Sequence, residues 1–227
     1  MDAASRKQID SNLHILPSET KKAFIFLSEQ LWLDEGGWYL AGGTALALQA
    51  GHRQSVDLDF FSTKKEFDEP ELLNNFLENN GWETILNRKN TIYGQLFKAK
   101  VSFIAYPFFI PKQDFLRYGA IKILRSLDIA VMKIVAISQR GRKRDFFDLY
   151  WCAKNIEPLE GLIKRIKVQY PFVAHDYHHI LKSLVYFEDA ESDPSPENVF
   201  GASWPEVKSF FIKEITAITG RMIQGKI

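Results

Sequence analysis

The sequence predicts an α+β fold, with a mixed β-sheet flanked by helices in the first half of the chain and an all-helical second half. Apolar runs with the alternation of strands are confined to about the first 120 residues, and apolar residues at helical spacing fill the rest. Of the 227 residues, 46% are hydrophobic, which is enough to bury a substantial core. We therefore expect two domains, residues 1–120 and 121–227, without a flexible linker between them.

Capping residues, helix-stopping glycines and β-branched runs place the individual elements. In the first half, Ser18 is the expected N-cap of the first strong helix, and Phe24, Leu27, Leu31 and Leu33 are its expected apolar face. The expected elements of this half are a helix at 16–37, a strand at 38–41, a helix at 44–51, a strand at 55–62, a helix at 68–81 and two or three strands between 82 and 109. The expected helices of the second half span 126–141, 142–155, 157–170, 174–187 and 203–224, with an acidic, Pro-rich loop at 188–201.

Composition excludes several broad classes of protein. The net charge is +1, from 29 Lys and Arg against 28 Asp and Glu. The chain therefore lacks the overall basic excess that would indicate nucleic-acid binding. The single cysteine, Cys152, cannot form an intramolecular disulfide, and its apolar neighbours predict a buried thiol. Neither a signal peptide nor a membrane-spanning run is recognisable, so we expect a soluble, cytoplasmic protein without a membrane partner.

Two carboxylates interrupt the apolar strand at 55–62. Asp57 and Asp59 are two residues apart, so their side chains project from the same face of a strand, while Val56, Leu58 and Phe60 are expected to face the core. Adjacent carboxylates raise each other's pKa unless a cation lies between them. The pair therefore indicates a Mg²⁺ site completed by substrate phosphates, and the alternative is a solvated sheet face.

A Gly-Gly-Thr turn precedes this strand, at a point where another strand becomes a helix. Gly42 and Gly43 allow close approach of a ligand to the backbone, and exposed N–H groups at a helix start attract phosphate. The Thr44 hydroxyl is expected to cap the helix or to donate to a phosphate. Together, the turn and the carboxylates provide what transfer from a nucleoside triphosphate requires, which is charge neutralisation and in-line positioning.

A third group of charged residues lies in the helical half. Lys133 is placed within an apolar helix face, where an ammonium needs an anionic partner. Asp145 and Asp148 are three residues apart and share a helix face. The alternative for this stretch is a surface pair between Arg144 and Asp148 beside a solvated basic turn. The basic run at 140–144 is also a candidate contact for RNA or phosphate.

The three groups together resemble the AbiEii/AbiGii family of nucleotidyltransferase toxins, within the polymerase-β-like nucleotidyltransferase superfamily. The superfamily signature is an apolar residue and a Gly-Gly or Gly-Ser pair, followed by Asp-x-Asp or Asp-x-Glu, which is matched by 41–43 and 57–60. The narrower family pattern is similar to Arg53-x-Ser55-x-Asp57-x-Asp59 and to Lys133 followed by Arg144-Asp145-x-x-Asp148. The resemblance covers about residues 38–151.

The resemblance implies a function: Mg²⁺-dependent (or Mn²⁺-dependent) transfer of a nucleotide from a nucleoside triphosphate to an acceptor. It implies that Asp57 and Asp59 hold the metal and that Lys133 offsets charge on a phosphate. Asp148, with Asp145 as the second choice, would complete the site as a metal-proximal carboxylate or a base, in a cleft between the domains. The residues implied to contact the nucleotide are Gly42, Gly43, Thr44, Arg53, Ser55 and Arg144.

The resemblance also implies partners. The protein would be the toxin of a toxin–antitoxin or phage-abortive-infection pair, with RNA, particularly tRNA, as acceptor and a cognate antitoxin protein. One position departs from the pattern, since Ser102 stands where many nucleotidyltransferases carry a third carboxylate. The alternatives are therefore a small-molecule, antibiotic-type nucleotidyltransferase and a catalytically lapsed module that binds a nucleotide or a partner.

Overall fold

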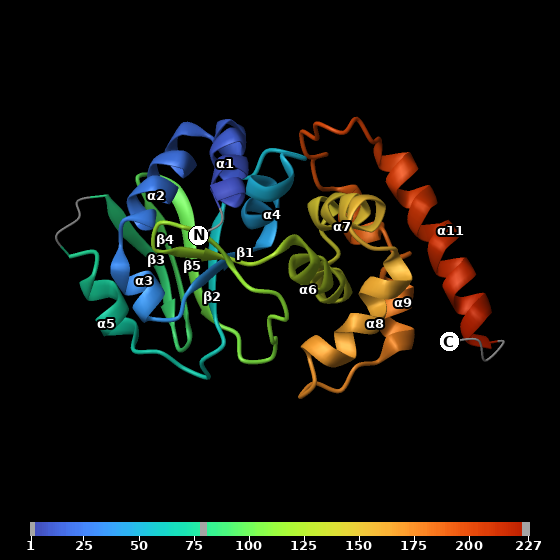
Figure 1. Ribbon diagram of the computed structural model, residues 1–227. Helices are drawn as coiled ribbons and strands as arrows, with labels where there is room; N and C mark the ends of the chain where they lie inside the picture. The colour runs from blue at the N-terminus through green and yellow to red at the C-terminus, as the bar shows by residue number, and fades with distance from the viewer. Residues whose placement is uncertain (1–2, 78–80, 224–227) are drawn as a thin grey trace. The chain divides into compact units, whose positions relative to one another are not determined.

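The structure is a computed structural model, and it describes residues 3–77 and 81–223. The chain divides into two compact units, residues 1–125 (unit 1) and 126–227 (unit 2). Unit 1 contains a seven-stranded mixed sheet with flanking helices, and the described part of unit 2 is helical (Figure 1). The predicted α+β class is confirmed.

Unit 1 begins with helices, alternates strands with helices from β1 to α5, and ends with five consecutive strands. In chain order its elements are α1 (Ala3–Asn12), a short 3-10 helix (Leu13–Ile15), α2 (Ser18–Ser28), α3 (Leu31–Glu35), β1 (Tyr39–Ala41), α4 (Gly42–Ala50), β2 (Leu58–Ser62), α5 (Glu69–Asn74), β3 (Trp82–Arg88), β4 (Thr91–Leu96), β5 (Ala99–Ala105), β6 (Leu116–Tyr118) and β7 (Ile121–Ile123).

The strands are arranged in the order β3-β4-β5-β2-β1-β7-β6. β2 is central, pairing antiparallel with β1 and parallel with β5. The register sets Ala41 opposite Asp59 and Asp59 opposite Ser102. As a result, the end of β1, the start of β2 and the start of β5 lie at the same edge of the sheet.

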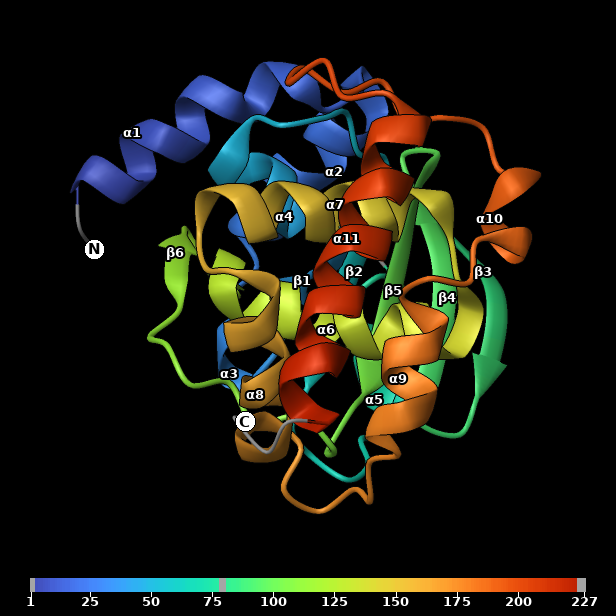
Figure 2. The same cartoon turned by 90° about the vertical axis from the view of Figure 1, so that its right-hand side faces the viewer.

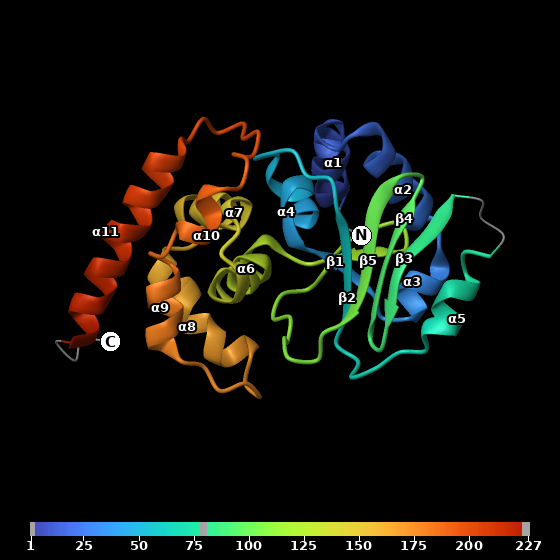
Figure 3. The ribbon, with the colours of Figure 1, turned by 180° about the vertical axis from the view of Figure 1, so that it is seen from behind.

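Aromatic side chains fill the core on one face of this sheet. Phe103 of β5 is fully buried and stacks on Phe60 of β2, with ring centroids 5.3 Å apart. Trp32 and Trp38 pack against the same Phe103 ring. Figure 3 shows α2, α3 and α5 on this side of strands β3, β4 and β5. The face that carries Phe60 and Phe103 is therefore closed by helices.

The helix expected at 16–37 is two helices. α2 ends at Ser28 and α3 starts at Leu31, and the N-cap of α2 is Pro17 rather than Ser18, whose hydroxyl donates to Glu19 instead. Leu31 is 71% exposed, so its expected place on the apolar face is wrong. The break at 29–30 changes the direction of the chain, which removes Leu31 from the face that a continuous helix would have buried.

Unit 2 consists of α6 (Ser126–Arg140), α7 (Lys143–Asn155), α8 (Leu159–Gln169), α9 (Tyr177–Ser183), α10 (Glu188–Glu191) and α11 (Trp204–Ile223). Helix α6 is the centre of its packing and contacts α7, α8 and α9. Helix α11 contacts α7 and α8, as Figure 2 shows. Within the described ranges, none of the helices combines the length and apolar character that crossing a bilayer would require.

Asp34 fastens the end of α3 to the β6–β7 hairpin. Its carboxylate lies 2.8 Å from Arg117 Nη1 and 2.5 Å from Lys122 Nζ. The hydrogen bonds from Arg117 and then Lys122 lower the pKa of Asp34 from 3.8 to about 2. Because the folded-state pKa lies below the unfolded value, this contribution to stability is complete above the unfolded pKa and is lost as the pH falls towards the folded pKa.

Replacing Asp34→Asn is expected to lower the free energy of unfolding at neutral pH by about 1 kcal/mol or less, since the pair is partly exposed to solvent. The difference from the wild type should shrink as the pH falls from about 4 to about 2. Urea unfolding at several pH values measures it, with the exposed neighbour Glu35→Gln as control. A difference that stays constant across this range would contradict the assignment.

Candidate functional site

The chain turns from β1 into α4 directly against a carboxylate. Gly42, the first residue of α4, has φ +71°, a conformation that residues with a side chain rarely adopt. A Cβ atom at this position would lie 3.1 Å from Asp59 Oδ2. Glycine is therefore required here for two independent reasons, and the start of α4 lies against the Asp59 carboxylate.

The next residues of the turn contact the segment that leads into β2. A Cβ atom at Gly43 would lie 2.4 Å from Arg53 Nη2 and 3.1 Å from Ser55 Oγ. Thr44 is 1% exposed, and its Oγ1 lies within hydrogen-bond distance of Ser55 Oγ, at 2.9 Å, and of the Asp57 carbonyl oxygen. Thr44 is inside the first turn of α4, whose N-cap is Ala41, so the expected helix cap at Thr44 is wrong. Its hydroxyl instead holds the Asp57 segment against the helix.

The two carboxylates lie at the start of β2. Asp59 lies within the strand and Asp57 directly precedes it, and both are half-buried, whereas Leu58 and Phe60 are buried. Val56 is 47% exposed and does not face the core as expected. Because β2 begins at Leu58, the alternation that buries every second residue does not extend back to Val56.

Ser102 completes the surroundings of Asp59. It lies opposite Asp59 in the β2–β5 register, and its hydroxyl donates to Asp59 Oδ1 at 2.7 Å. The side chain at this position therefore orients the carboxylate of Asp59. Among residues 3–77 and 81–223, no group of three or more His, Cys, Asp or Glu is placed to hold a metal ion. A cation at this site would have Asp57 and Asp59 as its carboxylate ligands.

Unit 2 contains a buried ionic cluster. Lys133 Nζ lies 2.5 Å from Asp145 Oδ1 and 2.7 Å from Asp148 Oδ2. Both carboxylates are fully buried, and Lys133 is 5% exposed. Arg140 Nη2 lies 3.5 Å from Asp145 Oδ2, so two cations and two anions balance. Asp148 is thus a buried partner of Lys133 rather than a residue of the surface.

A buried thiol lies beside this cluster. Cys152 is fully buried, as expected. Burial raises the pKa of this thiol, and the Asp148 carboxylate raises it further, against an opposing effect of Lys133. Cys152 is therefore a neutral, packed side chain at physiological pH.

The basic run at 140–144 is largely occupied by contacts within unit 2. The Arg142 guanidinium holds Asp193 through two contacts of 2.8 Å. Lys143 is 5% exposed, and its ammonium donates to the Asp193 carbonyl oxygen at 2.6 Å. Arg144 is half-buried on α7. The run fastens the 191–193 segment to the start of α7, while Arg140 and Arg142 stay exposed, so its expected contact with RNA or phosphate stays a prediction.

The expected site residues thus form two groups. Unit 1 brings together the turn at the start of α4, the two carboxylates and the Arg53–Ser55 segment, and unit 2 brings Lys133 together with Asp145 and Asp148. The roles implied for these residues, and the cleft expected between the domains, stay predictions.

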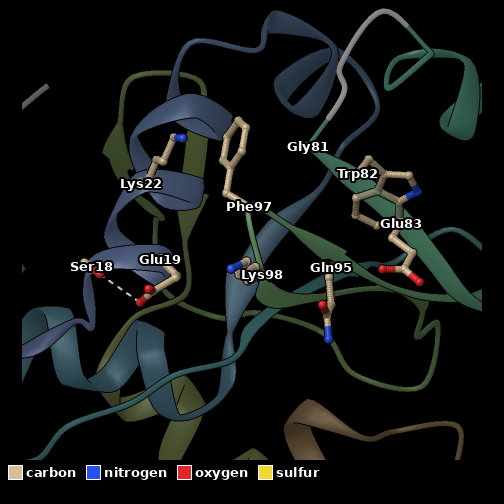
Figure 4. Close-up of a pocket in the computed structure, with 9 residues that line it drawn as sticks. All are labelled: Ser18, Glu19, Lys22, Gly81, Trp82, Glu83, Gln95, Phe97 and Lys98. Carbon is tan, nitrogen blue, oxygen red and sulfur yellow. Dashed lines mark hydrogen bonds between the residues drawn. The ribbon is translucent and has the colours of Figure 1, made fainter.

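A pocket that the sequence did not indicate lies at the same edge of the sheet as Asp59. Its volume is about 550 Å³ (Figure 4), and it is lined by Ser18, Glu19, Lys22, Gly81, Trp82, Glu83, Gln95, Phe97 and Lys98. Phe97 and Lys98 form the β4–β5 turn with φ of +51° and +71°. Such a turn usually carries Asn or Gly, so no sequence signal marked it.

Fold and site together define a nucleotidyltransferase-type protein. The whole-chain likeness to solved structures includes MenT4, a nucleotidyltransferase toxin of Mycobacterium tuberculosis H37Rv, with a TM-score of 0.54 and 16% identity over 94% of this chain and 89% of that one. It also includes an H. pylori protein crystallised as a candidate nucleotidyltransferase, with a TM-score of 0.52 and 16% identity over 92% and 98% of the two chains. At this level of identity the likeness concerns the fold.

Sequence comparison identifies the family. The profile described as "Nucleotidyl transferase AbiEii toxin, Type IV TA system" matches residues 26–123 and 101–214. The chain is also 36% identical over 181 residues to an uncharacterized protein of Aquifex aeolicus (strain VF5), covering 78% of this chain and 86% of that protein. The chain belongs to the AbiEii family of nucleotidyltransferase toxins.

Replacing Lys133→Met is expected to lower the free energy of unfolding by about 3–5 kcal/mol, because it leaves two buried carboxylates without their ammonium partner. Adding Asp145→Asn and Asp148→Asn to this variant should restore part of the loss. Urea unfolding measures both effects, with the exposed Lys167→Met of α8 as control. If Lys133→Met cost no more than Lys167→Met, the cluster would not stabilise unit 2.

Proposed function

We propose that this protein transfers a nucleotidyl group from a nucleoside triphosphate to RNA, with Mg²⁺ (or Mn²⁺) held by Asp57 and Asp59. The observation that carries the proposal is the approach of Gly42 to Asp59, where an added Cβ would lie 3.1 Å from the carboxylate oxygen. No side chain separates the start of α4 from the proposed metal ligands. A triphosphate can therefore contact both at once.

The residues present fit a hard cation. Mg²⁺ is commonly bound in enzymes by one or two carboxylates together with substrate phosphates, and Asp57 and Asp59 supply two carboxylates at the start of a strand. The Ser102 hydroxyl fixes Oδ1 of Asp59, while Oδ2 faces the helix start. When bound, the metal would neutralise charge that develops on the phosphates.

The start of α4 would bind the terminal phosphates. Its first N–H groups have no partner within the helix, and the helix dipole favours an anion at this end. The buried contacts of Thr44 and Arg53 hold this turn in place, so binding does not have to order it. In the proposed step, an acceptor hydroxyl oxygen bonds to the α-phosphorus as the bond to pyrophosphate breaks. The hydroxyl proton passes to a base or to solvent.

For unit 2 we propose that the Lys133 ammonium offsets negative charge during transfer. Asp148, or else Asp145, would serve as a metal-proximal carboxylate or as the base, and Arg144 would contact phosphate. In support, Lys133 and the two carboxylates lie together in one buried cluster.

The family description supports the proposed partners. A toxin of a type IV toxin–antitoxin system has a cognate antitoxin, and we propose one for this chain, with a role in abortive infection. We propose tRNA as the acceptor. A triphosphate donor and tRNA are cytoplasmic molecules, so we expect the protein to act there.

Calorimetric titration with each of the four ribonucleoside triphosphates, with and without Mg²⁺, tests the donor site. We expect Mg²⁺-dependent binding of one triphosphate and about 100-fold weaker binding, equivalent to ~2.8 kcal/mol, in the Asp57→Asn, Asp59→Asn variant. The exposed Asp114→Asn is the matched control. Equal binding by the wild type and the double variant would contradict the proposed metal and phosphate site.

A further inference from the structure

The sheet face that carries Asp59 continues beyond β2 onto β5 and β4. Asp59 lies opposite Ser102 of β5, and Ser102 lies opposite Tyr93 of β4. The hydrogen bond from Ser102 to Asp59 shows that these two side chains share a face, and directly opposed residues of an antiparallel pair also share one. Tyr93 is therefore on the Asp59 face, two strands away, at about 10 Å from strand spacing alone.

Tyr93 does not belong to the core. Along β4 the side chains alternate, with Ile92 and Leu96 fully buried on one face and Tyr93, between them, 41% exposed on the other. Lys100, two residues before Ser102 on β5, is also exposed and points to the same face. An aromatic ring and an ammonium are thus presented together on the face where the proposed reaction takes place.

In-line geometry assigns the two sides of this face to different substrates. In a nucleotidyl transfer the attacking oxygen and the leaving pyrophosphate lie on opposite sides of the α-phosphorus. The helix start proposed to bind the terminal phosphates follows β1, on one side of β2. With the terminal phosphates at the start of α4, the side of β5 and β4 is the side from which we expect the acceptor hydroxyl to approach.

We propose that Tyr93 and Lys100 form the acceptor platform of this enzyme, with an unpaired terminal base of RNA stacked on the Tyr93 ring and a neighbouring phosphate paired with Lys100. This inference rests on the proposed nucleotidyl transfer and names residues that position its acceptor. Stacking on an aromatic ring suits single-stranded RNA, because every base has a π-face and paired bases do not offer theirs.

The pocket of Figure 4 lies at the end of the same strands, between them and α2. Gln95, two residues after Tyr93 on β4, faces the same way and lines this pocket. The volume of about 550 Å³ is of the size that accepts a small organic ligand, and Trp82 and Phe97 supply aromatic surface. Lys22 and Lys98 contribute positive charge, opposed by Glu19 and Glu83.

The test compares variants of Tyr93 for binding of a short fluorescent single-stranded RNA, measured by anisotropy in the full-length protein. Tyr93→Thr removes the ring but keeps a β-branched residue suited to a strand, and Tyr93→Phe keeps the ring. Phe108→Thr removes another exposed ring of unit 1, from the loop beyond the far end of β5. Thermal unfolding confirms that each variant is folded.

We expect Tyr93→Thr to weaken RNA binding by about 5- to 100-fold, with Tyr93→Phe and Phe108→Thr within about 2-fold of the wild type. Lys100→Gln should weaken binding and reduce its dependence on salt. Wild-type affinity in Tyr93→Thr, an equal loss in Phe108→Thr, or no binding of RNA by the wild type would each overturn the platform.

The triphosphate titration separates this inference from the proposed function. Tyr93→Thr should bind the donor triphosphate with Mg²⁺ as the wild type does, because Tyr93 lies on the acceptor side. Intact triphosphate binding together with unchanged RNA binding in this variant overturns the platform alone. Loss of triphosphate binding in Tyr93→Thr would also overturn it, since the ring would then serve the donor.

Discussion

The structure of the site depends on the close approach of the start of α4 to Asp59. The antiparallel pairing of β1 and β2 sets Ala41 opposite Asp59, so the residue that follows β1 must turn away within reach of the carboxylate. Only glycine satisfies both the backbone angle and the space at Gly42. This one turn brings the N-terminal end of a helix and a pair of carboxylates to the same edge of the sheet.

The surrounding contacts keep this arrangement rigid. Thr44 holds the segment before β2, Arg53 lies against Gly43, and Ser102 orients Asp59. These groups are buried polar side chains with partners, so they define a unique geometry rather than adding much net stability. In unit 2, the cluster around Lys133 combines two buried carboxylates with two cations, which makes a charged core tolerable.

Part of this could be predicted from the sequence, because it depends on local patterns. The spacing of Asp57 and Asp59 and the Gly42–Gly43 pair indicated residues that the structure brings close together. The i,i+3 spacing of Asp145 and Asp148 predicted a shared helix face, and both side chains contact Lys133. The features that were missed depend on contacts between distant segments. The helix break before Leu31, the exposure of Val56 and the internal use of Thr44 follow from tertiary packing, which hydrophobic periodicity does not encode.

The proposed acceptor platform likewise combines a strand that local patterns predict with a position that only long-range pairing sets. Tyr93 lies in a strand that the sequence predicted, but its place on the Asp59 face follows only from the register of β4, β5 and β2. Register depends on turns and long-range pairing. The β4–β5 turn at Phe97 and Lys98 contains no Gly or Asn, the residues by which such a turn is usually recognised in a sequence.

The most direct test of nucleotidyl transfer is to follow the two ends of the donor separately. The wild type is incubated with Mg²⁺, tRNA and a triphosphate labelled either at the α-phosphate or at the γ-phosphate. We expect the α-label to enter RNA and the γ-label to leave as pyrophosphate. The Asp57→Asn, Asp59→Asn variant should neither label RNA nor release pyrophosphate. Transfer of the γ-label to RNA, or transfer of the α-label that persists in this variant, would contradict the proposed transfer.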